Sequence, residues 1–296
     1  MNTVEIVEVG PRDGLQNESV TLSVDDRVEL IGRLGAAGLK TIEVGAFVRI
    51  DRVPQMAGSD LVFEKTGNLG FNQRICLVPN ARGLEAARVA GVQDVAVFVA
   101  TSETFNQRNS NCSVDEGLSH AEVVVNSSKR DGLNVRGYVS TIAGCPYEGK
   151  TSVAEVVRVA ERLFEMGCDE ISLGDTIGIG RPQQIGAIVE AVSGVVPIDR
   201  LAFHGHDTFG MGVANALAAI DRGVRRIDAS VGGLGGCPFG GPRAKGNLAT
   251  EDLVYALGES EFRFPLNLTA IIDAAWWLSE KVGHDPRSAV ALAGRT

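Results

Sequence analysis

The fold of this chain is indicated by residues 4–17, which read Val-Glu-Ile-Val-Glu-Val and then Gly-Pro-Arg-Asp-Gly-Leu-Gln-Asn. The first six residues are rich in β-branched side chains and predict a strand, which the following glycine and proline end. Residues 23–34 then carry apolar side chains at helical spacing and predict an amphipathic helix. A strand, a polar loop and a helix in this order make one β/α unit.

The same unit recurs along the rest of the chain. Runs that predict strands occupy residues 4–9, 41–44, 74–78, 94–99, 135–140, 170–174, 201–204 and 225–229. Segments that predict helices occupy residues 23–34, 81–90, 116–131, 153–165, 182–192 and 211–222. Eight such units predict parallel strands that close a (β/α)8 TIM barrel, and an open doubly wound sheet is the alternative.

The chain of 296 residues shows no linker, repeat or low-complexity stretch that would divide it. We therefore expect one barrel domain over residues 1–296, in which the barrel occupies about residues 1–258. A further helical pattern at residues 268–282 predicts extra C-terminal helices within an extension over residues 259–296.

The composition is that of an ordinary globular protein, with 44% hydrophobic and 22% charged residues. The net charge of −9 argues against nucleic acid and anionic membranes as partners, because both would repel the chain. The sequence contains neither an apolar run of membrane-spanning length nor the features of a signal peptide. Five scattered cysteines favour reduced thiols in the cytoplasm over a disulfide framework.

Two histidines, His204 and His206, follow each other at a spacing of two residues at the end of a predicted strand. Residues i and i+2 of a strand point to the same face, so both imidazoles can bind one metal ion. The alternative is a pair of polar residues that merely leave the strand. Polar loops after the strands of a barrel lie at its C-terminal face, where active sites are built.

A carboxylate, Asp13, and a fixed positive charge, Arg12, follow the first predicted strand. Asp13 can face the two histidines across the barrel mouth, and Arg12 suits a carboxylate or a developing enolate oxygen. The alternative is a local ion pair between the two residues. Glu8 and Glu43 lie near the ends of strands one and two, and each is expected to meet Arg12, a metal shell or a backbone donor, because an unpaired buried carboxylate is costly.

A glycine-rich segment, residues 232–241, contains Cys237 and follows the last predicted strand. Its glycines permit positive φ angles, so we interpret the segment as a lid that carries a thiol acid or nucleophile. A phosphate-binding loop and an inert cysteine in a turn are the alternatives. Asn247 follows and is either the N-cap of a helix or a metal ligand. Together with Asp13 and the two histidines it makes an oxygen–nitrogen donor set suited to Mg²⁺ or Mn²⁺.

Taken together, these motifs resemble the 3-hydroxy-3-methylglutaryl-CoA lyase family, which belongs to the metal-dependent lyases and acyl-CoA synthases built on TIM barrels. The resemblance covers nearly the whole chain. The segments that carry it are residues 8–18, 53–56, 136–140, 144–149, 172–178, 204–208, 232–238 and 246–252.

The resemblance implies a role for each candidate residue. The metal ligands would be Asp13, His204, His206 and Asn247. The catalytic residues would be Arg12 as the partner of an enolate, Cys237 as the acid/base of the lid, Asp175 as a proton-handling group and Glu43 in the surrounding polar shell. Glu8, Gln16, Tyr138 and Ser172 would bind substrate or surround the metal ligands.

The implied reaction is the retro-Claisen cleavage of 3-hydroxy-3-methylglutaryl-CoA, or a close 3-alkyl homologue, to acetyl-CoA and acetoacetate or the matching 3-oxo acid. The resemblance further implies an acyl-CoA thioester as the partner, a homodimer and a place in leucine catabolism, and the cysteines favour a cytoplasmic location. Synthases of the isopropylmalate or homocitrate type on the same barrel are the alternative, although these commonly carry long C-terminal regulatory regions. A metal-dependent hydrolase is a further alternative, and a catalytically silent binding protein is the third.

Two segments depart from the family pattern. The family usually has Ser-Phe-Val-Ser-Pro-Lys-Trp where residues 46–52 read Ala-Phe-Val-Arg-Ile-Asp-Arg. The segment at residues 239–245 is one residue longer than the commonest form. Both lie near the expected substrate or lid, so we expect them to affect the 3-substituent of the substrate more than the reaction.

Overall fold

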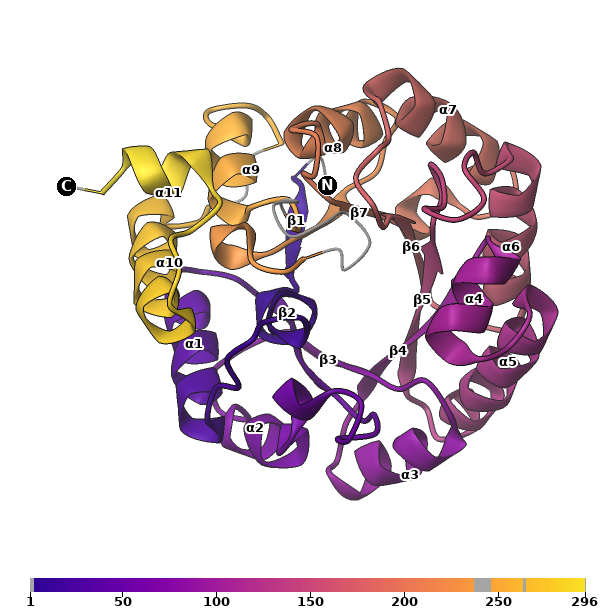
Figure 1. Ribbon diagram of the computed structural model, residues 1–296, viewed down its shortest axis with the longest axis horizontal. Helices are drawn as coiled ribbons and strands as arrows, with labels where there is room; N and C mark the ends of the chain where they lie inside the picture. Colours follow the sequence, from indigo (N-terminus) through magenta and orange to yellow (C-terminus); the bar gives the residue numbers. More distant parts are fainter. Residues whose placement is uncertain (1–2, 237–245, 263–264, 296) are drawn as a thin grey trace.

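Eight parallel strands close into a barrel in the computed structural model, which describes residues 3–236, 246–262 and 265–295 (Figure 1). Each strand pairs with the next one in the sequence, and the eighth pairs with the first. This closure confirms the predicted TIM barrel and excludes the open sheet. The strands are β1 (Glu5–Glu8), β2 (Thr41–Ala46), β3 (Gln73–Leu77), β4 (Asp94–Ala100), β5 (Asn134–Ser140), β6 (Glu170–Asp175), β7 (Leu201–Gly205) and β8 (Arg226–Ala229).

Helices form a ring around the barrel; the last but one packs against the helix that follows β1, and the last packs against the two helices before it (Figure 1). In the described part of the chain, no helix combines the length and apolar character that a membrane crossing requires. The α-helices are α1 (Val24–Ala36), α2 (Ser59–Lys65), α3 (Ala81–Val89), α4 (Glu103–Ser110), α5 (Val114–Arg130), α6 (Val153–Glu165), α7 (Pro182–Val192), α8 (Gly212–Asp221), α9 (Thr250–Leu257), α10 (Leu268–Val282) and α11 (Ala289–Ala293). Shorter helical turns are η1 (Gly10–Gly14), η2 (Pro54–Met56), η3 (Ile198–Arg200) and η4 (Val231–Gly233).

The predicted strands all occur, with ends displaced by one or two residues at most, and α6, α7 and α10 have the predicted bounds. The short helices α2, α4 and α11 are not indicated by hydrophobic periodicity. In α4, Phe105 is the one large apolar residue, so the sequence carries little helical period. Its start is set instead by a cap, because the hydroxyl oxygen of Ser102 accepts a hydrogen bond from the Phe105 amide at 3.1 Å.

The interior of the barrel is more polar than the branched aliphatic layers usual for this fold. Hydrogen bonds cross it from β5 to β2 and from β5 to β8. The apolar core lies mainly between the outer face of the strands and the helices. The buried side chains that join in the interior network are Glu43, Arg136, Tyr138, Glu170, Ser172 and Asp228.

Outside the barrel, α1 buries one arginine completely. The guanidinium of Arg27 donates hydrogen bonds to the carbonyl oxygens of Ala57 at 2.9 Å and Val44 at 3.1 Å, and to the hydroxyl oxygen of Ser59 at 3.3 Å. Burial lowers the pKa of Arg27 to about 10. No carboxylate pairs with it among the described residues, so backbone dipoles solvate this charge. The contacts attach the segment before α2 to β2 and α1.

Replacing this arginine tests whether it supports the loop that follows β2. We expect Arg27→Met to lower the free energy of unfolding by about 2–4 kcal/mol, because buried carbonyl groups lose their donors. Urea denaturation followed by circular dichroism measures the change. The control is Arg162→Met on α6, which removes only an exposed pair with Glu165 and should shift stability by less than about 0.5 kcal/mol. Equal losses in the two variants would show that Arg27 has no special role.

Candidate active site

The predicted metal ligands of strands one and seven meet at the C-terminal end of the barrel. Ligand atoms of Asp13, His204 and His206 all lie within 4.8 Å of one another. His204 lies in β7 and His206 directly follows this strand, and their ring centroids are 5.2 Å apart. Asp13 reaches the histidines because the chain after β1 forms the π-helical turn η1, with Pro11 in its first turn.

The side chain of Asn247 joins this cluster through its amide group. The Nδ2 atom donates to Asp13 Oδ2 at 2.9 Å and to the carbonyl oxygen of Leu234 at 3.1 Å. The N-cap of α9 is Ala249, and no side chain caps that helix. The alternative that Asn247 is a helix cap is therefore wrong, and the residue lies beside the predicted ligands.

Two buried polar atoms of the cluster have no hydrogen-bond partner in the described structure, His206 Nδ1 and Asn247 Oδ1. Buried polar atoms are normally satisfied, so two unpaired atoms beside a carboxylate fit a cation site. Burial, and then the charge of His204, lower the pKa of His206 to about 4, so its imidazole is neutral near pH 7. The carboxylate, amide and imidazole donors together fit a divalent metal ion.

Arg12 is held by carboxylates on two sides. Its Nε and Nη2 atoms each lie 2.7 Å from Glu43 Oε2, and its Nη1 atom lies 2.8 Å from Asp13 Oδ1. The hydroxyl group of Tyr138 donates to the other Glu43 oxygen at 2.8 Å. Burial works against the charge of Arg12, but Glu43 and Asp13 raise its pKa further above its ordinary value. The local Arg12–Asp13 pair therefore exists, and it forms part of the wider site.

Glu8 meets backbone donors, which were one of the three kinds of partner expected for it. Its Oε1 atom accepts hydrogen bonds from the amides of Gly10 at 2.8 Å and Val231 at 2.9 Å, and its Oε2 atom accepts one from the Thr250 hydroxyl at 2.7 Å. Of the partners expected for Glu8, these contacts are with backbone donors, and the Arg12 contacts come from Glu43 and Asp13. Side chains alternate along β1, and Glu8 points outward to α9, where it fixes the backbone turns at the ends of β1 and β8.

The remaining candidates are placed as follows. The carboxylate of Asp175, at the end of β6, accepts hydrogen bonds from the amides of Ile179 at 3.2 Å and Gly180 at 2.9 Å. Burial raises the pKa of Asp175 to about 6, although these amides oppose the shift. Gln16 is half-buried just after η1. Cys237 lies outside the described residues.

Sequence reasoning missed Asp228 of β8, although its side chain is buried against the predicted ligand His204. Asp228 Oδ2 lies 3.1 Å from His204 Nδ1 and 3.2 Å from the hydroxyl oxygen of Ser172, which donates to it. Asp228 Oδ1 accepts a hydrogen bond from Arg136 Nη2 at 2.6 Å. A charged residue inside a buried strand is the signal that points to Asp228, but its partner becomes visible only when β7 and β8 pair.

Known proteins match this chain over nearly its whole length. The family model described as HMGL-like matches residues 3–277. Hydroxymethylglutaryl-CoA lyase of Pseudomonas mevalonii is 47% identical, over 99% of this chain and 97% of that protein. A protein of Pseudomonas aeruginosa named 3-hydroxy-3-isohexenylglutaryl-CoA/hydroxy-methylglutaryl-CoA lyase is 45% identical, over 98% of this chain and 96% of its own length.

Solved structures give the same result. A crystal structure of hydroxymethylglutaryl-CoA lyase from Pseudomonas aeruginosa superposes with a TM-score of 0.95 at 44% identity, covering 99% of this chain and 98% of that chain. An HMG-CoA lyase from Acinetobacter baumannii in complex with coenzyme A and 3-methylmalate superposes with a TM-score of 0.92 at 35% identity. That comparison covers 100% of this chain and 96% of the other.

The geometry of the cluster predicts how metal binding responds to the loss of a single imidazole. We expect His206→Ala to weaken Mn²⁺ binding by more than about 100-fold, since even changes outside the ligand shell cost about 10–100-fold. Isothermal titration calorimetry measures the dissociation constant. The control is His120→Ala, which removes an exposed histidine on α5 and should leave binding unchanged. If His206→Ala bound Mn²⁺ as tightly as the wild type, His206 would not be a ligand.

Proposed function

The chain belongs to the HMGL-like family, and on this premise we propose that it cleaves 3-hydroxy-3-methylglutaryl-CoA, or a close 3-alkyl homologue, to acetyl-CoA and a 3-oxo acid. The protein is a carbon–carbon lyase. The observation that carries the substrate proposal is the full-length match to hydroxymethylglutaryl-CoA lyases together with the cluster of Asp13, His204 and His206. The match favours the lyase reaction over the synthase and hydrolase alternatives.

We propose that Asp13, His204, His206 and Asn247 hold a divalent cation. Mg²⁺ and Mn²⁺ suit the mixture of oxygen and nitrogen donors, and no thiolate joins these ligands among the described residues. A divalent cation held there would supply Lewis-acid polarisation of substrate oxygens, which would lower the pKa of the 3-hydroxyl group. The amide of Asn247 restrains the Asp13 carboxylate by its hydrogen bond.

The proposed reaction starts with removal of the proton from the 3-hydroxyl group. The pKa of Asp175 is about 6, so this carboxylate is ionised near pH 7 and can take part in handling that proton. The electron pair of the O–H bond becomes the second bond of the new C3 carbonyl group, and the bond between C2 and C3 breaks. Its electron pair moves into the thioester enolate of the departing acetyl-CoA.

Arg12 is placed to stabilise the negative charge of the enolate that this step creates. Three of its five N–H bonds face Glu43 and Asp13, and the others remain for a substrate oxygen. Because Glu43 and Tyr138 fix the guanidinium before the reaction, Arg12 can stabilise the enolate oxygen without reorganising. Cys237 is the proposed donor of the proton that C2 needs to give acetyl-CoA, on the strength of the sequence motif alone.

We also propose a cellular location, an oligomeric state and a metabolic role for the enzyme. The described cysteines, Cys76, Cys112, Cys145 and Cys168, are all buried and free, which suits the proposed cytoplasmic location. A homodimer and a role in leucine catabolism are also proposed. Light scattering coupled to size-exclusion chromatography tests the dimer.

The role of Arg12 predicts a kinetic effect that is separate from metal binding. We expect Arg12→Gln to lower kcat by roughly 10³-fold, because a charge partner of the transition state is lost. The Mn²⁺ dissociation constant should change only a few-fold. The control is Arg222→Gln, which removes an exposed pair with Glu190 and should keep normal kinetics. Near-normal turnover of Arg12→Gln would show that another cation stabilises the enolate.

The altered segment at residues 46–52 and the longer segment at 239–245 predict a graded preference for the 3-substituent. We propose that the enzyme accepts the methyl substrate and prefers a different or larger 3-alkyl group. One methylene group changes selectivity by about 1–3 kcal/mol in an apolar pocket. Measurement of kcat/KM for a series of 3-hydroxy-3-alkylglutaryl-CoA thioesters, with Mg²⁺ and with Mn²⁺, tests this. A steep fall with each added carbon would leave only the methyl substrate, and no cleavage of any thioester would refute the proposed function.

A further inference from the structure

The barrel interior contains a continuous column of ion pairs that the proposed reaction does not use. At the N-terminal end, Arg226 of β8 pairs with Glu170 of β6, and the Nε atom of Arg136 lies 2.7 Å from the other Glu170 oxygen. Arg136 then pairs with Asp228, and Asp228 reaches His204. The column therefore ends at a predicted metal ligand.

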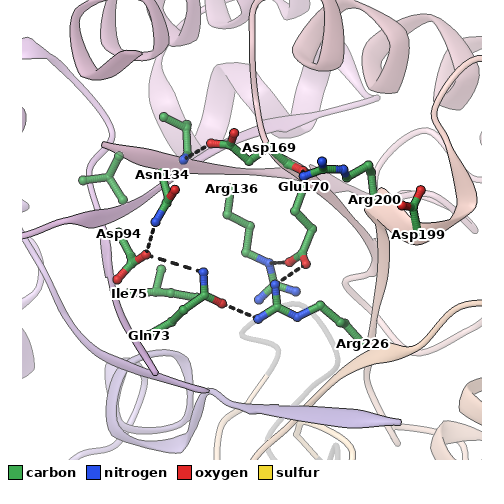
Figure 2. A pocket seen from close by; sticks show the side chains of 12 residues that line it. Gln73, Ile75, Asp94, Asn134, Arg136, Asp169, Glu170, Asp199, Arg200 and Arg226 are labelled. Carbon is green, nitrogen blue, oxygen red and sulfur yellow. Dashed lines mark hydrogen bonds and ion pairs between the residues drawn. The ribbon is translucent and has the colours of Figure 1, made fainter. Parts of the chain in front are cut away.

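Arg136, Glu170 and Arg226 of this column border a pocket of about 220 Å³ at the N-terminal ends of the strands (Figure 2). Figure 2 shows the guanidinium groups of Arg136 and Arg226 close together beside the Glu170 carboxylate, with Gln73 next to Arg226. Arg136 and Arg226 thus pair with protein carboxylates, and Arg226 also with the side-chain amide of Gln73. None of the His204 cluster residues is among those that line this pocket.

At the C-terminal end of the column, Asp228 is placed to hold the imidazole of His204, a predicted metal ligand. Residues His204 and Asp228 are direct neighbours in the register of β7 and β8. One Asp228 oxygen faces His204 Nδ1 at 3.1 Å, and the other accepts from Arg136 at 2.6 Å. The Ser172 hydroxyl donates to the oxygen that faces the imidazole. The carboxylate is held from two sides, so its direction toward the imidazole is set by β5 and β6.

We propose that Asp228 is a positioning residue that keeps the proton of His204 on Nδ1 and directs Nε2 toward the metal ion. This inference rests on the proposed metal site. A carboxylate cannot donate when ionised, so the Nδ1 atom must carry the hydrogen of this contact. The Nε2 atom then remains for the cation, and it is the atom that lies 4.0 Å from Asp13 Oδ2. Partners of this kind fix the tautomer and orientation of metal-binding histidines.

The two histidines differ in this support. His206 Nδ1 is buried without a hydrogen-bond partner in the described structure, whereas His204 is held by a carboxylate that Arg136 neutralises. Arg136 also donates to the Tyr138 hydroxyl at 3.0 Å, and Tyr138 in turn donates to Glu43. One buried arginine therefore supports the metal ligand through Asp228 and Arg12 through Tyr138 and Glu43.

The test compares two isosteric variants that each remove one carboxylate from Arg136. We expect Asp228→Asn to weaken Mn²⁺ binding by about 10–100-fold in isothermal titration calorimetry. The matched control is Glu170→Gln, which alters the same column at its other end and does not touch His204. Its Mn²⁺ affinity should stay within a few-fold of the wild type. Equal affinities of wild type and Asp228→Asn, or equal losses in both variants, would overturn the proposal.

A measurement on the wild type without metal keeps the proposal testable if Asp228→Asn does not fold. The sequence has only four histidines, so imidazole nitrogen signals in ¹⁵N NMR can be assigned with single His→Gln variants. We expect Nδ1 of His204 to be protonated in either charge state of the ring. An unprotonated Nδ1 would overturn the role of Asp228. Absence of Mn²⁺ binding to the wild type would instead refute the proposed metal site, while the NMR result still decides the tautomer.

Discussion

The pairing of Arg136 with Asp228 and Glu170 is the interaction on which the interior of this barrel depends. A charge that is removed from water is costly unless an opposite charge with good hydrogen-bond geometry meets it. Arg136 and Glu170 are neighbours on the adjacent strands β5 and β6, whereas Arg136 and Asp228 join β5 to β8 across the barrel interior. The curvature of the barrel therefore brings the second carboxylate to this buried arginine.

The buried ion pairs of Arg136 also fix the side chains of the candidate site in the absence of substrate. Arg136 acts on the His204 side through Asp228, and on the Arg12 side through Tyr138 and Glu43. Groups fixed in this way need no reorganisation when charge develops, which is the main source of electrostatic catalysis. A rigid barrel with charged side chains at its C-terminal mouth thus fixes the orientation of these groups.

Local patterns in the sequence determined most of the fold. Strand runs, helical periods and serine caps depend on neighbouring residues, and the eight strands follow from them within one or two residues at each end. The short helix α4 escapes such reasoning because its apolar content is low. The His-Gly-His spacing indicated a shared metal site for a local reason as well, since side chains alternate along a strand.

Other features were decided only by the tertiary structure. Glu8 and Glu43 look alike in the sequence, yet one points outward to α9 and the other inward to Arg12. Asp228 has no recognisable motif, and its role arises from its register beside His204. By itself, the sequence determined the barrel, the family and the identity of the proposed ligands. The pairing of distant strands decided which charges meet, because an ion pair depends on distance in space rather than along the chain.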